Sequence, residues 1–223
     1  PEFASSPQIL GRFRNEATAA GQIGSPHICD ILDFGQSELG PYIVMELMKG
    51  RALNDLIEAS VRLDPGLAVL IVRQTLEGLD AAHRAGIIHR DLKPENIFLI
   101  ERRNDPNFAK VLDFGISKIA DAQGQDRSLT QTGTALGTPY YMAPEQCQGK
   151  RDIEHRADIY SLGVILFQAL TAQYPFDDES YPMLVLKICT EPPPSLAHYR
   201  PDVPQELQQI VNRMLAKDRD HRY

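Results

Sequence analysis

The strongest pattern of apolar and polar positions lies between residues 65 and 85 of the chain. Asp64 just before it suits a helix N-cap, Pro65 suits the first helical position, and Gly86 suits the residue after a helix end. The pattern therefore predicts one long amphipathic helix over Pro65–Ala85. Its apolar or small side chains recur at spacings of three and four and share one face: Leu67, Leu70, Ile71, Thr75, Leu79 and Ala82.

Three further helices and a linker follow from composition and periodicity. Ile159–Leu170 is apolar almost all round, as expected of a helix buried at the centre of a domain. Gln205–Ala216 has the pattern of an amphipathic helix, and Arg12–Ile23 is rich in alanine and charge before a Gly-Ser-Pro stop. The proline-rich Glu191–Pro204 is predicted to be a linker.

Short β-type runs come in two pairs. Ile28–Phe34 and Tyr42–Leu47 flank the turn-rich segment Gly35–Pro41, which is typical of a hairpin. Ile97–Ile100 and Ala109–Leu112 flank a polar linker and predict a second hairpin. Together these patterns predict an α+β protein in which a small β-containing portion precedes a mostly helical one.

Composition and charge exclude several classes of protein. The chain has 223 residues, of which 43% are apolar and 24% charged, enough for one large domain or two small ones. Its net charge of -7 argues against a main role in coating nucleic acid or an anionic membrane, since both need clustered positive charge. Its apolar runs are too short to span a bilayer. The three cysteines are widely spaced and suit a reducing, cytoplasmic compartment.

The residues that indicate chemistry lie between the long helix and the end of the second hairpin. Asp91 and Asn96 belong to the string at 89–96, and Asp113 follows the last strand. Taken singly, each would more often be a turn or cap residue. Together they would form an oxygen-rich cluster of the kind that Mg²⁺ prefers beside phosphates. A carboxylate free of metal could accept a proton from a hydroxyl, and Lys93 could balance negative charge.

Four motifs make the chain resemble the eukaryotic-type (Hanks-type) protein kinases, in the form of the bacterial serine/threonine kinases. They are His-Arg-Asp-Leu-Lys-Pro-Glu-Asn at 89–96, Asp-Phe-Gly at 113–115, Ala-Pro-Glu at 143–145 and Asp-Ile-Tyr-Ser-Leu-Gly at 158–163, in the order of that family. The resemblance extends from Phe13 to the end of the chain. Four motifs in one order make a chance match negligible.

The resemblance implies a bilobal α+β fold with an incomplete small lobe. Residues 1–48 would be the remainder of the small β lobe, and residues 49–223 the mostly helical large lobe without its last helix. No G-x-G-x-x-G occurs in the chain, and its first lysine is Lys49. The family places a glycine-rich loop and an ATP-binding lysine before the helix that would carry Glu16, so the chain is expected to begin after the first strands of the small lobe.

The resemblance assigns the catalytic roles residue by residue. Asp91 resembles the base that orients and deprotonates the substrate hydroxyl, and Asn96 and Asp113 resemble the Mg²⁺ ligands that bridge the ATP phosphates. Lys93 is similar to the lysine that contacts the transferred phosphate. Thr138 resembles the threonine that hydrogen-bonds the base and shapes the substrate site. Lys93 and Thr138 together imply serine and threonine as acceptors in protein substrates.

The nucleotide contacts are implied in the same way. The segment Tyr42–Met48, named the hinge segment here, resembles the one that holds adenine in the family. Met45 would be the gatekeeper, and the Glu46 carbonyl and the Met48 amide would be the partners of adenine. Phe98 would lie beneath the purine, and Glu16 would pair with the ATP-binding lysine.

Structural pairs are implied as well. Glu145 should pair with Arg222, and Asp158 should hold the backbone of the catalytic loop at residues 89–96. His89 and Phe114 should stack on each other.

The polar stretch inside residues 113–145 would be the activation loop. Thr130, Thr132 and Thr134 are candidate sites of autophosphorylation, and Arg90 would be the partner of a phosphate there.

Two functions compete at this point. The first is an active serine/threonine kinase that uses ATP and Mg²⁺, of which the 223 residues alone should show little activity because phosphate positioning would be lost. The second is a pseudokinase that acts as a binding or scaffold module. A third class, a nucleotide-binding regulator without phosphoryl transfer, would need the nucleotide pocket but not Lys93 or Thr138. The combination of Asp91, Lys93, Asn96 and Asp113 favours the first, since a scaffold has no chemical need for all four. Relatives often carry a transmembrane segment after the kinase domain, and nothing in these 223 residues shows one.

Overall fold

The structure is a computed structural model that describes residues 23–38, 40–114 and 139–223. The expected helix over Arg12–Ile23 lies outside this part, apart from its last residue. The elements, where η denotes a 3₁₀ turn, are β1 (Ile31–Ser37), β2 (Gly40–Met45), β3 (Gly50–Ala52), α2 (Leu53–Ala59), α3 (Pro65–Arg84), η2 (Pro94–Asn96), β4 (Ile97–Arg102), β5 (Asp105–Val111), η4 (Pro139–Tyr141), α4 (Pro144–Cys147), α5 (Arg156–Thr171), α6 (Tyr181–Thr190), α7 (Leu196–Tyr199), α8 (Gln205–Met214) and η5 (Arg219–His221).

Helix α3 confirms the strongest sequence prediction. The Asp64 carboxylate accepts a hydrogen bond from the Leu67 N–H at 3.1 Å, which satisfies one of the free donors at the helix start. Pro65 occupies the first turn. Gly86 has a φ of +76°, a left-handed conformation that ends the helix and that glycine adopts without strain.

The first predicted hairpin is present as β1–β2, shifted by three residues. The strand was expected to begin at Ile28, but β1 begins at Ile31 and pairs with β2 through Ser37 and Gly40. Residues 27–29 pair instead with the end of β5, where the Cys29 N–H donates to the Val111 carbonyl at 2.9 Å. The run from Ile28 to Phe34 does form β pairs, but Ile28 pairs with Val111 of β5, whereas the residues from Ile31 onward pair with β2.

The second hairpin is longer than predicted. Strands β4 and β5 continue through the polar linker as far as the pair Arg102 and Asp105, so the turn is only two residues long. Arg103 in this turn has a φ of +55°. The sequence prediction limited each strand to its apolar residues. The strands of a hairpin can continue through residues that are polar on both faces where the tip is exposed to water. Strand β3 joins the sheet beside β4, giving the order β3-β4-β5.

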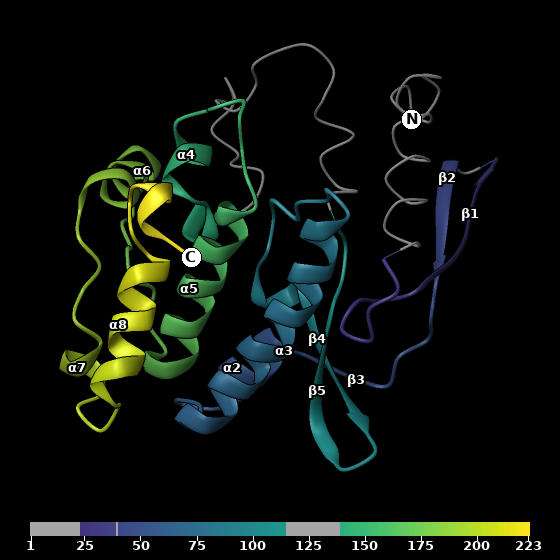
Figure 1. Cartoon of the computed structure of the whole chain (residues 1–223), viewed down its shortest axis with the longest axis horizontal. Coiled ribbons are helices and arrows are strands. Elements are labelled where there is room, and N and C mark those ends of the chain that lie inside the picture. Colours follow the sequence, from purple (N-terminus) through teal and green to yellow (C-terminus); the bar gives the residue numbers. More distant parts are fainter. Residues whose placement is uncertain (1–22, 39, 115–138) are drawn as a thin grey trace.

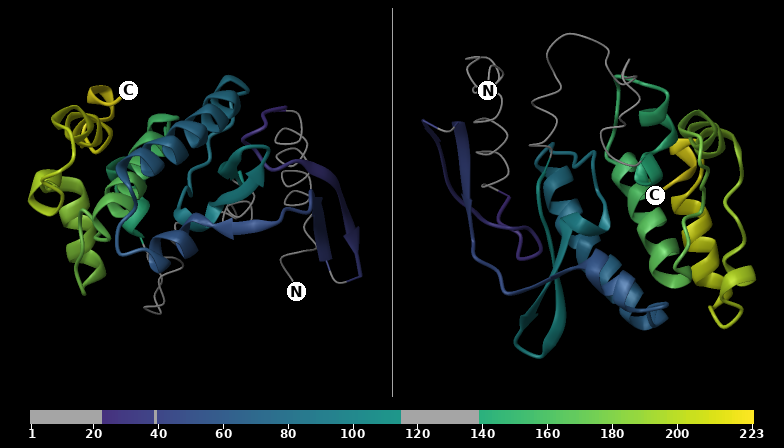
Figure 2. Two further views of the ribbon diagram at one scale, coloured as in Figure 1. Left: turned by 90° about the horizontal axis from the view of Figure 1, so that it is seen from below. Right: turned by 180° about the vertical axis from the view of Figure 1, so that it is seen from behind.

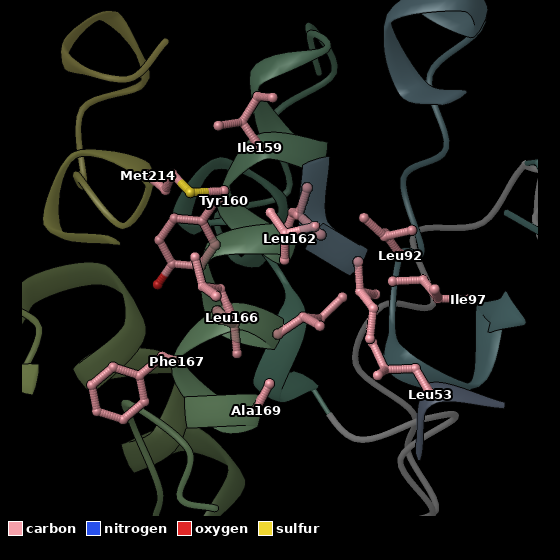
Figure 3. Close-up of a cluster of buried hydrophobic side chains, with 14 of the residues drawn as sticks. Leu53, Leu92, Ile97, Ile159, Tyr160, Leu162, Leu166, Phe167, Ala169 and Met214 are labelled. Atoms are coloured by element: carbon pink, nitrogen blue, oxygen red, sulfur yellow. The ribbon is translucent and has the colours of Figure 1, made fainter. Parts of the chain in front are cut away.

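The core surrounds α5, which lies between α3 and α8 (Figure 1). Nearly every residue of α5 is buried, as the all-round apolar pattern predicted. Figure 3 shows α5 side chains such as Leu162 pointing toward Leu92 and Ile97, while Tyr160 faces Met214. Gly163 allows α8 to approach closely, because an added Cβ would lie 2.7 Å from the Met214 Cβ. The catalytic-loop region therefore rests on the centre of the core.

The remaining elements complete the helical side. Helices α2 and α6 were not predicted, and α7 interrupts the segment expected to be a linker. The predicted amphipathic helix near the end is confirmed as α8. In both views of Figure 2 the β1–β2 hairpin lies at the opposite end of the molecule from α6, α7 and α8. Within the described ranges, no helix is both long and apolar enough to cross a membrane.

Candidate active site

The segment at residues 89–96, named the catalytic loop here, is anchored by one buried carboxylate. Asp158 in the first turn of α5 is 0% exposed. Its two oxygens accept backbone hydrogen bonds from the His89 N–H at 2.9 Å and the Arg90 N–H at 2.8 Å. This confirms the expected anchor. His83 on α3 adds a contact that was not foreseen, with its Nε2 atom 2.8 Å from an Asp158 oxygen.

The His89 side chain links the catalytic loop to the segment after β5. Its Nδ1 atom accepts the Asp91 N–H at 3.3 Å, so the ring proton belongs on Nε2, which donates to the Leu112 carbonyl at 2.8 Å. Burial lowers the pKa of His89, which keeps the ring neutral in this arrangement. The ring also lies against Phe114, with centroids 5.0 Å apart and planes at 53°, so the expected contact is present but the rings are tilted rather than stacked.

Three of the predicted site residues lie together in the catalytic loop. The Lys93 Nζ atom is 3.7 Å from an Asp91 carboxylate oxygen, and both side chains are partly open to solvent. The Asn96 amide nitrogen donates to the Asp91 carbonyl at 3.0 Å. The amide oxygen of Asn96 takes no part in this bond. Asn96 is buried, so its orientation is set by this contact.

Asp113 follows directly on the same network. The Leu112 N–H donates to the Asn96 carbonyl at 2.8 Å, and the Leu112 carbonyl accepts from His89. The next residue, Asp113, has an exposed side chain and a φ of +52°. Arg90 in the catalytic loop has a φ of +65°. Left-handed backbone at non-glycine residues stores strain, and such residues concentrate at functional sites.

Helix α4 supports the catalytic loop from the other side. The Gln146 side chain donates to the Arg90 carbonyl at 2.7 Å. The neighbouring Glu145 forms two hydrogen bonds with the buried Arg222 guanidinium, at 2.7 and 2.9 Å, which confirms the expected pair. A bidentate pair of this kind fixes direction as well as distance.

The hinge segment begins within β2 and leads toward β3 through Glu46, Leu47 and Met48. Met45 is the last residue of β2 and pairs with Ile31. The Glu46 N–H donates to the Asp30 carbonyl at 3.0 Å. Among the residues that the structure describes, none accepts a hydrogen bond from the Met48 N–H.

Phe98 lies on β4, the strand next to β3 in the three-stranded sheet. It pairs across the sheet with Ala52 on one side and Lys110 on the other. The Lys110 ammonium forms an ion pair with the Glu46 carboxylate. The structure therefore brings Phe98 and Glu46 of the hinge segment into one neighbourhood. Several predicted residues lie outside the described ranges, namely Glu16, Thr130, Thr132, Thr134 and Thr138.

A family model described as "Protein kinase domain" matches residues 4–223 of the chain. The chain belongs to the protein kinase family. This confirms the resemblance read from the four motifs and the α+β kinase fold that it implied.

The chain is similar to several named kinases. It is 43% identical to serine/threonine-protein kinase pkn3 of Myxococcus xanthus, an alignment that covers 96% of this chain and 40% of the relative. It is 36% identical to PrkC of Bacillus subtilis, covering 100% of this chain and 33% of the relative. It is also 36% identical to PknA of Mycobacterium tuberculosis, covering 100% and 50%. The chain thus spans half or less of the length of these relatives.

Solved kinase structures share the fold. The kinase domain of Mycobacterium tuberculosis PknI superposes with a TM-score of 0.72 at 26% identity, covering 100% of this chain and 76% of that one. Rad53 1–466 in complex with AMP-PNP gives a TM-score of 0.77 at 26% identity, covering 94% and 51%. Both likenesses extend over nearly all of this kinase-family chain.

Sequence reasoning missed three residues that support the site. His83, Lys110 and Gln146 each bond to a residue that had been predicted, yet none was singled out. Lys110 had a usable signal, because a lysine between Ala109 and Val111 in an apolar strand must find a partner if the strand is buried. His83 and Gln146 lie at ordinary helix positions and had no such signal.

Proposed function

We propose that this chain is the catalytic part of a serine/threonine protein kinase, which transfers the γ-phosphoryl group of ATP to serine and threonine hydroxyls of proteins. The observation that carries the proposal is the single hydrogen-bonded unit formed by the catalytic loop, Asp158 and Leu112. It presents Asp91, Lys93 and Asn96 from one loop, next to Asp113. The names of the Myxococcus, Bacillus and Mycobacterium relatives support the acceptor class.

Asp91 is the proton acceptor in this proposal. Its carboxylate is partly open to solvent, so an incoming hydroxyl can reach it, and its backbone is held by His89 and Asn96. A positioned carboxylate orients the hydroxyl and takes its proton as the bond to phosphorus forms. Lys93, 3.7 Å away, places a positive charge where the transferred phosphoryl group gathers negative charge.

Asn96 and Asp113 are suited to hold magnesium. Both offer oxygen donors, the amide oxygen of Asn96 and the carboxylate of Asp113, and a hard cation selects such oxygens. A magnesium ion bound there would neutralise charge on the ATP phosphates. The protein contributes by fixing Asn96 through its bond to the Asp91 carbonyl and by fixing Leu112 immediately before Asp113.

The hinge segment is the proposed adenine site. The Met48 N–H and the Glu46 carbonyl would bond the edge of the base, Met45 would be the gatekeeper, and Phe98 would lie against the face of the purine. The Met48 N–H has no acceptor in the described part of the chain, and Met48 is only partly buried, so this donor is open to a ligand. The Rad53 neighbour was solved with AMP-PNP bound, which supports a nucleotide in this fold.

The remaining assignments are proposals from the family pattern. Glu16 would pair with an ATP-binding lysine, and Thr138 would contact the base. Autophosphorylation is proposed at Thr130, Thr132 or Thr134, and mapping phosphate only outside residues 128–138 of active protein would disprove it. The three cysteines are free, as suits the proposed cytoplasmic compartment.

The proposal is tested by phosphate transfer from labelled ATP to a generic protein substrate, using the natural gene product that carries this sequence. Asp91→Asn should abolish transfer, a loss of about 100-fold or more, while ATP binding measured by calorimetry is retained. Asp113→Asn should also weaken the Mg²⁺-dependent part of ATP binding. The matched control is Asp80→Asn on exposed α3 surface, which should leave transfer unchanged.

Two results would contradict the proposal. If the unaltered protein binds ATP but transfers no phosphate, it is a binding module of the pseudokinase type. If Asp91→Asn keeps normal turnover, Asp91 is not the proton acceptor.

A further inference from the structure

Lys110 on β5 is a buried lysine that takes part in none of the proposed catalytic or nucleotide contacts. Lys110 is 6% exposed and lies near the end of the edge strand β5, between the buried residues Ala109 and Val111. Lysine is almost never buried to this extent unless its charge is paired, because removing an unpaired ammonium from water is expensive. The groups that bond the Lys110 ammonium therefore indicate the role of this residue.

The Lys110 ammonium meets two acceptors on two different segments. It forms an ion pair with the Glu46 carboxylate and donates to the Ile28 carbonyl at 3.2 Å. The same Glu46 carboxylate accepts the Asp30 N–H at 2.9 Å, and the Glu46 N–H donates to the Asp30 carbonyl at 3.0 Å. Lys110 thus joins β5 to the segment before β1 and to Glu46 of the hinge segment.

The electrostatics of Glu46 agree with a real ion pair. Burial alone would raise the pKa of Glu46, but the hydrogen bonds from Lys110 and from the Asp30 N–H lower it overall. Glu46 is therefore held as a carboxylate at neutral pH. A charge-assisted bond between two ionised groups is shorter and more directional than a neutral one.

Register places this pair beside the proposed adenine site. Lys110 and Phe98 are directly opposite each other on β5 and β4, so their side chains lie on the same face of the hairpin. The ammonium bonds the side chain of Glu46, whose own carbonyl is one proposed partner of adenine. Met48, the other proposed partner, follows two residues later.

We propose that Lys110 is a positioning residue for the adenine base, which it serves by holding Glu46 in place relative to Phe98. This inference rests on the proposed kinase function. The Lys110 ammonium bonds Glu46 and Ile28, and it acts on the base only through Glu46. It fixes the position of the hinge backbone relative to the Phe98 ring. The base can then lie against Phe98 and bond the hinge backbone at the same time. Binding geometry set in advance in this way improves affinity because less ordering is needed when the ligand binds.

A merely structural role makes a different prediction. If the ion pair only joined two parts of the fold, its loss would weaken the binding of every part of ATP alike, or none of it. If Lys110 positions the hinge segment, its loss should affect ligands that contain the base and leave base-free ligands unchanged.

The test uses three variants of the natural gene product: Lys110→Met, Glu46→Gln and the double variant. Steady-state transfer gives KM for ATP and kcat, while adenosine and inorganic tripolyphosphate serve as competitive probes of the base and phosphate sites. Lys150→Met, at an exposed lysine after α4, is the matched control. Glu46→Gln keeps the side-chain shape at a partly exposed position, so it carries the test if Lys110→Met does not fold.

We expect each single variant to raise KM for ATP and the inhibition constant of adenosine by about tenfold. We expect kcat to stay within about twofold and the constant for tripolyphosphate to stay unchanged. The double variant should be no weaker than Lys110→Met, because both changes remove one interaction.

Two outcomes would overturn the inference. Adenosine and tripolyphosphate could weaken alike, or neither could change while the unaltered protein transfers phosphate normally. Failure of the unaltered protein to transfer phosphate would instead overturn the proposed function, and adenosine binding by calorimetry would still decide whether Lys110 positions the base.

Discussion

The helix α5 region and the β1–β2 hairpin differ in how they are held. Almost all of α5 is buried, and its Asp158 holds the catalytic loop directly. In the hairpin, Leu32 is 64% exposed, Tyr42 44% and Met45 43%. The proposed phosphoryl-transfer residues therefore share the stability of the core, whereas the proposed adenine site depends on a few polar contacts at one junction.

The difference has a simple physical origin. A two-stranded hairpin is marginally stable in water by itself, because it buries little apolar surface. A helix buried on all sides gains from every neighbour around it. The contacts of Lys110 with Glu46 and Ile28 thus add side-chain links to the backbone hydrogen bonds by which residues 27–29 join the exposed region to the sheet that carries Phe98.

The largest expected effect comes from removing the anchor of the catalytic loop. Asp158→Ala removes the acceptor of the buried His89 N–H and of the partly buried Arg90 N–H, and it removes the carboxylate beside His83. We expect a loss of about 3–5 kcal/mol in the free energy of unfolding, measured by urea denaturation, together with a fall in kcat. Asp80→Ala, at an exposed surface pair, is the control and should change little. An Asp158→Ala protein as stable as the control would disprove the anchoring role.

A matched pair of apolar truncations compares the two regions directly. Leu162→Ala on α5 removes a fully buried side chain and should lower the free energy of unfolding by about 2–5 kcal/mol. Val44→Ala on β2 removes a side chain of a residue that is 41% exposed and should lower it by less than about 1 kcal/mol. Equal losses in denaturant titrations would mean that the hairpin is as well packed as the core.

The smallest expected effect is a pH dependence from His89. Burial lowers the pKa of His89 in the folded protein, whereas the unfolded chain binds the proton at an ordinary pKa near 6.5. Between these two values the unfolded state binds more protons, so stability rises with pH through this window. Stability is therefore lost as the pH falls below about 6.5, by at most about 1.4 kcal/mol per pH unit for one group.

This dependence can be assigned to its residue by comparing slopes. Denaturation midpoints measured from pH 7 to pH 5 should fall less steeply for His89→Gln than for the unaltered protein. His221→Gln, at an exposed histidine, serves as the control. The same slope in His89→Gln and in the unaltered protein would exclude His89 as the source.

The sequence predicted the parts of the fold whose signals are local and long. The helix at α3 has a cap, a proline and twenty residues of periodicity, and α5 has an unbroken apolar run. Strand β3 and helix α7 are three and four residues long, too short for a period to be recognised. Ile28 was assigned to the wrong strand, because an apolar run does not specify which neighbour it pairs with.

In the site, too, residues with a local sequence signal were predicted, and residues whose contacts depend on the fold were not. Asp91, Lys93, Asn96 and Asp113 were located because they occur in short motifs. The Glu145–Arg222 pair followed from the family pattern. The Lys110–Glu46 pair was not foreseen, since it joins residues far apart in the sequence whose meeting depends on how the hairpins are placed.

The most direct test of the contrast between the two regions is native-state amide hydrogen exchange in the nucleotide-free protein. We predict that the His89 and Arg90 amides, which donate to Asp158, exchange only on global unfolding, as slowly as the amides within α5. We predict that the amides of the β1–β2 ladder exchange through local opening at a clearly lower free energy. If the ladder is protected as strongly as α5, or if the His89 and Arg90 amides exchange as fast as the ladder, the catalytic loop does not share the stability of the core and the account is contradicted.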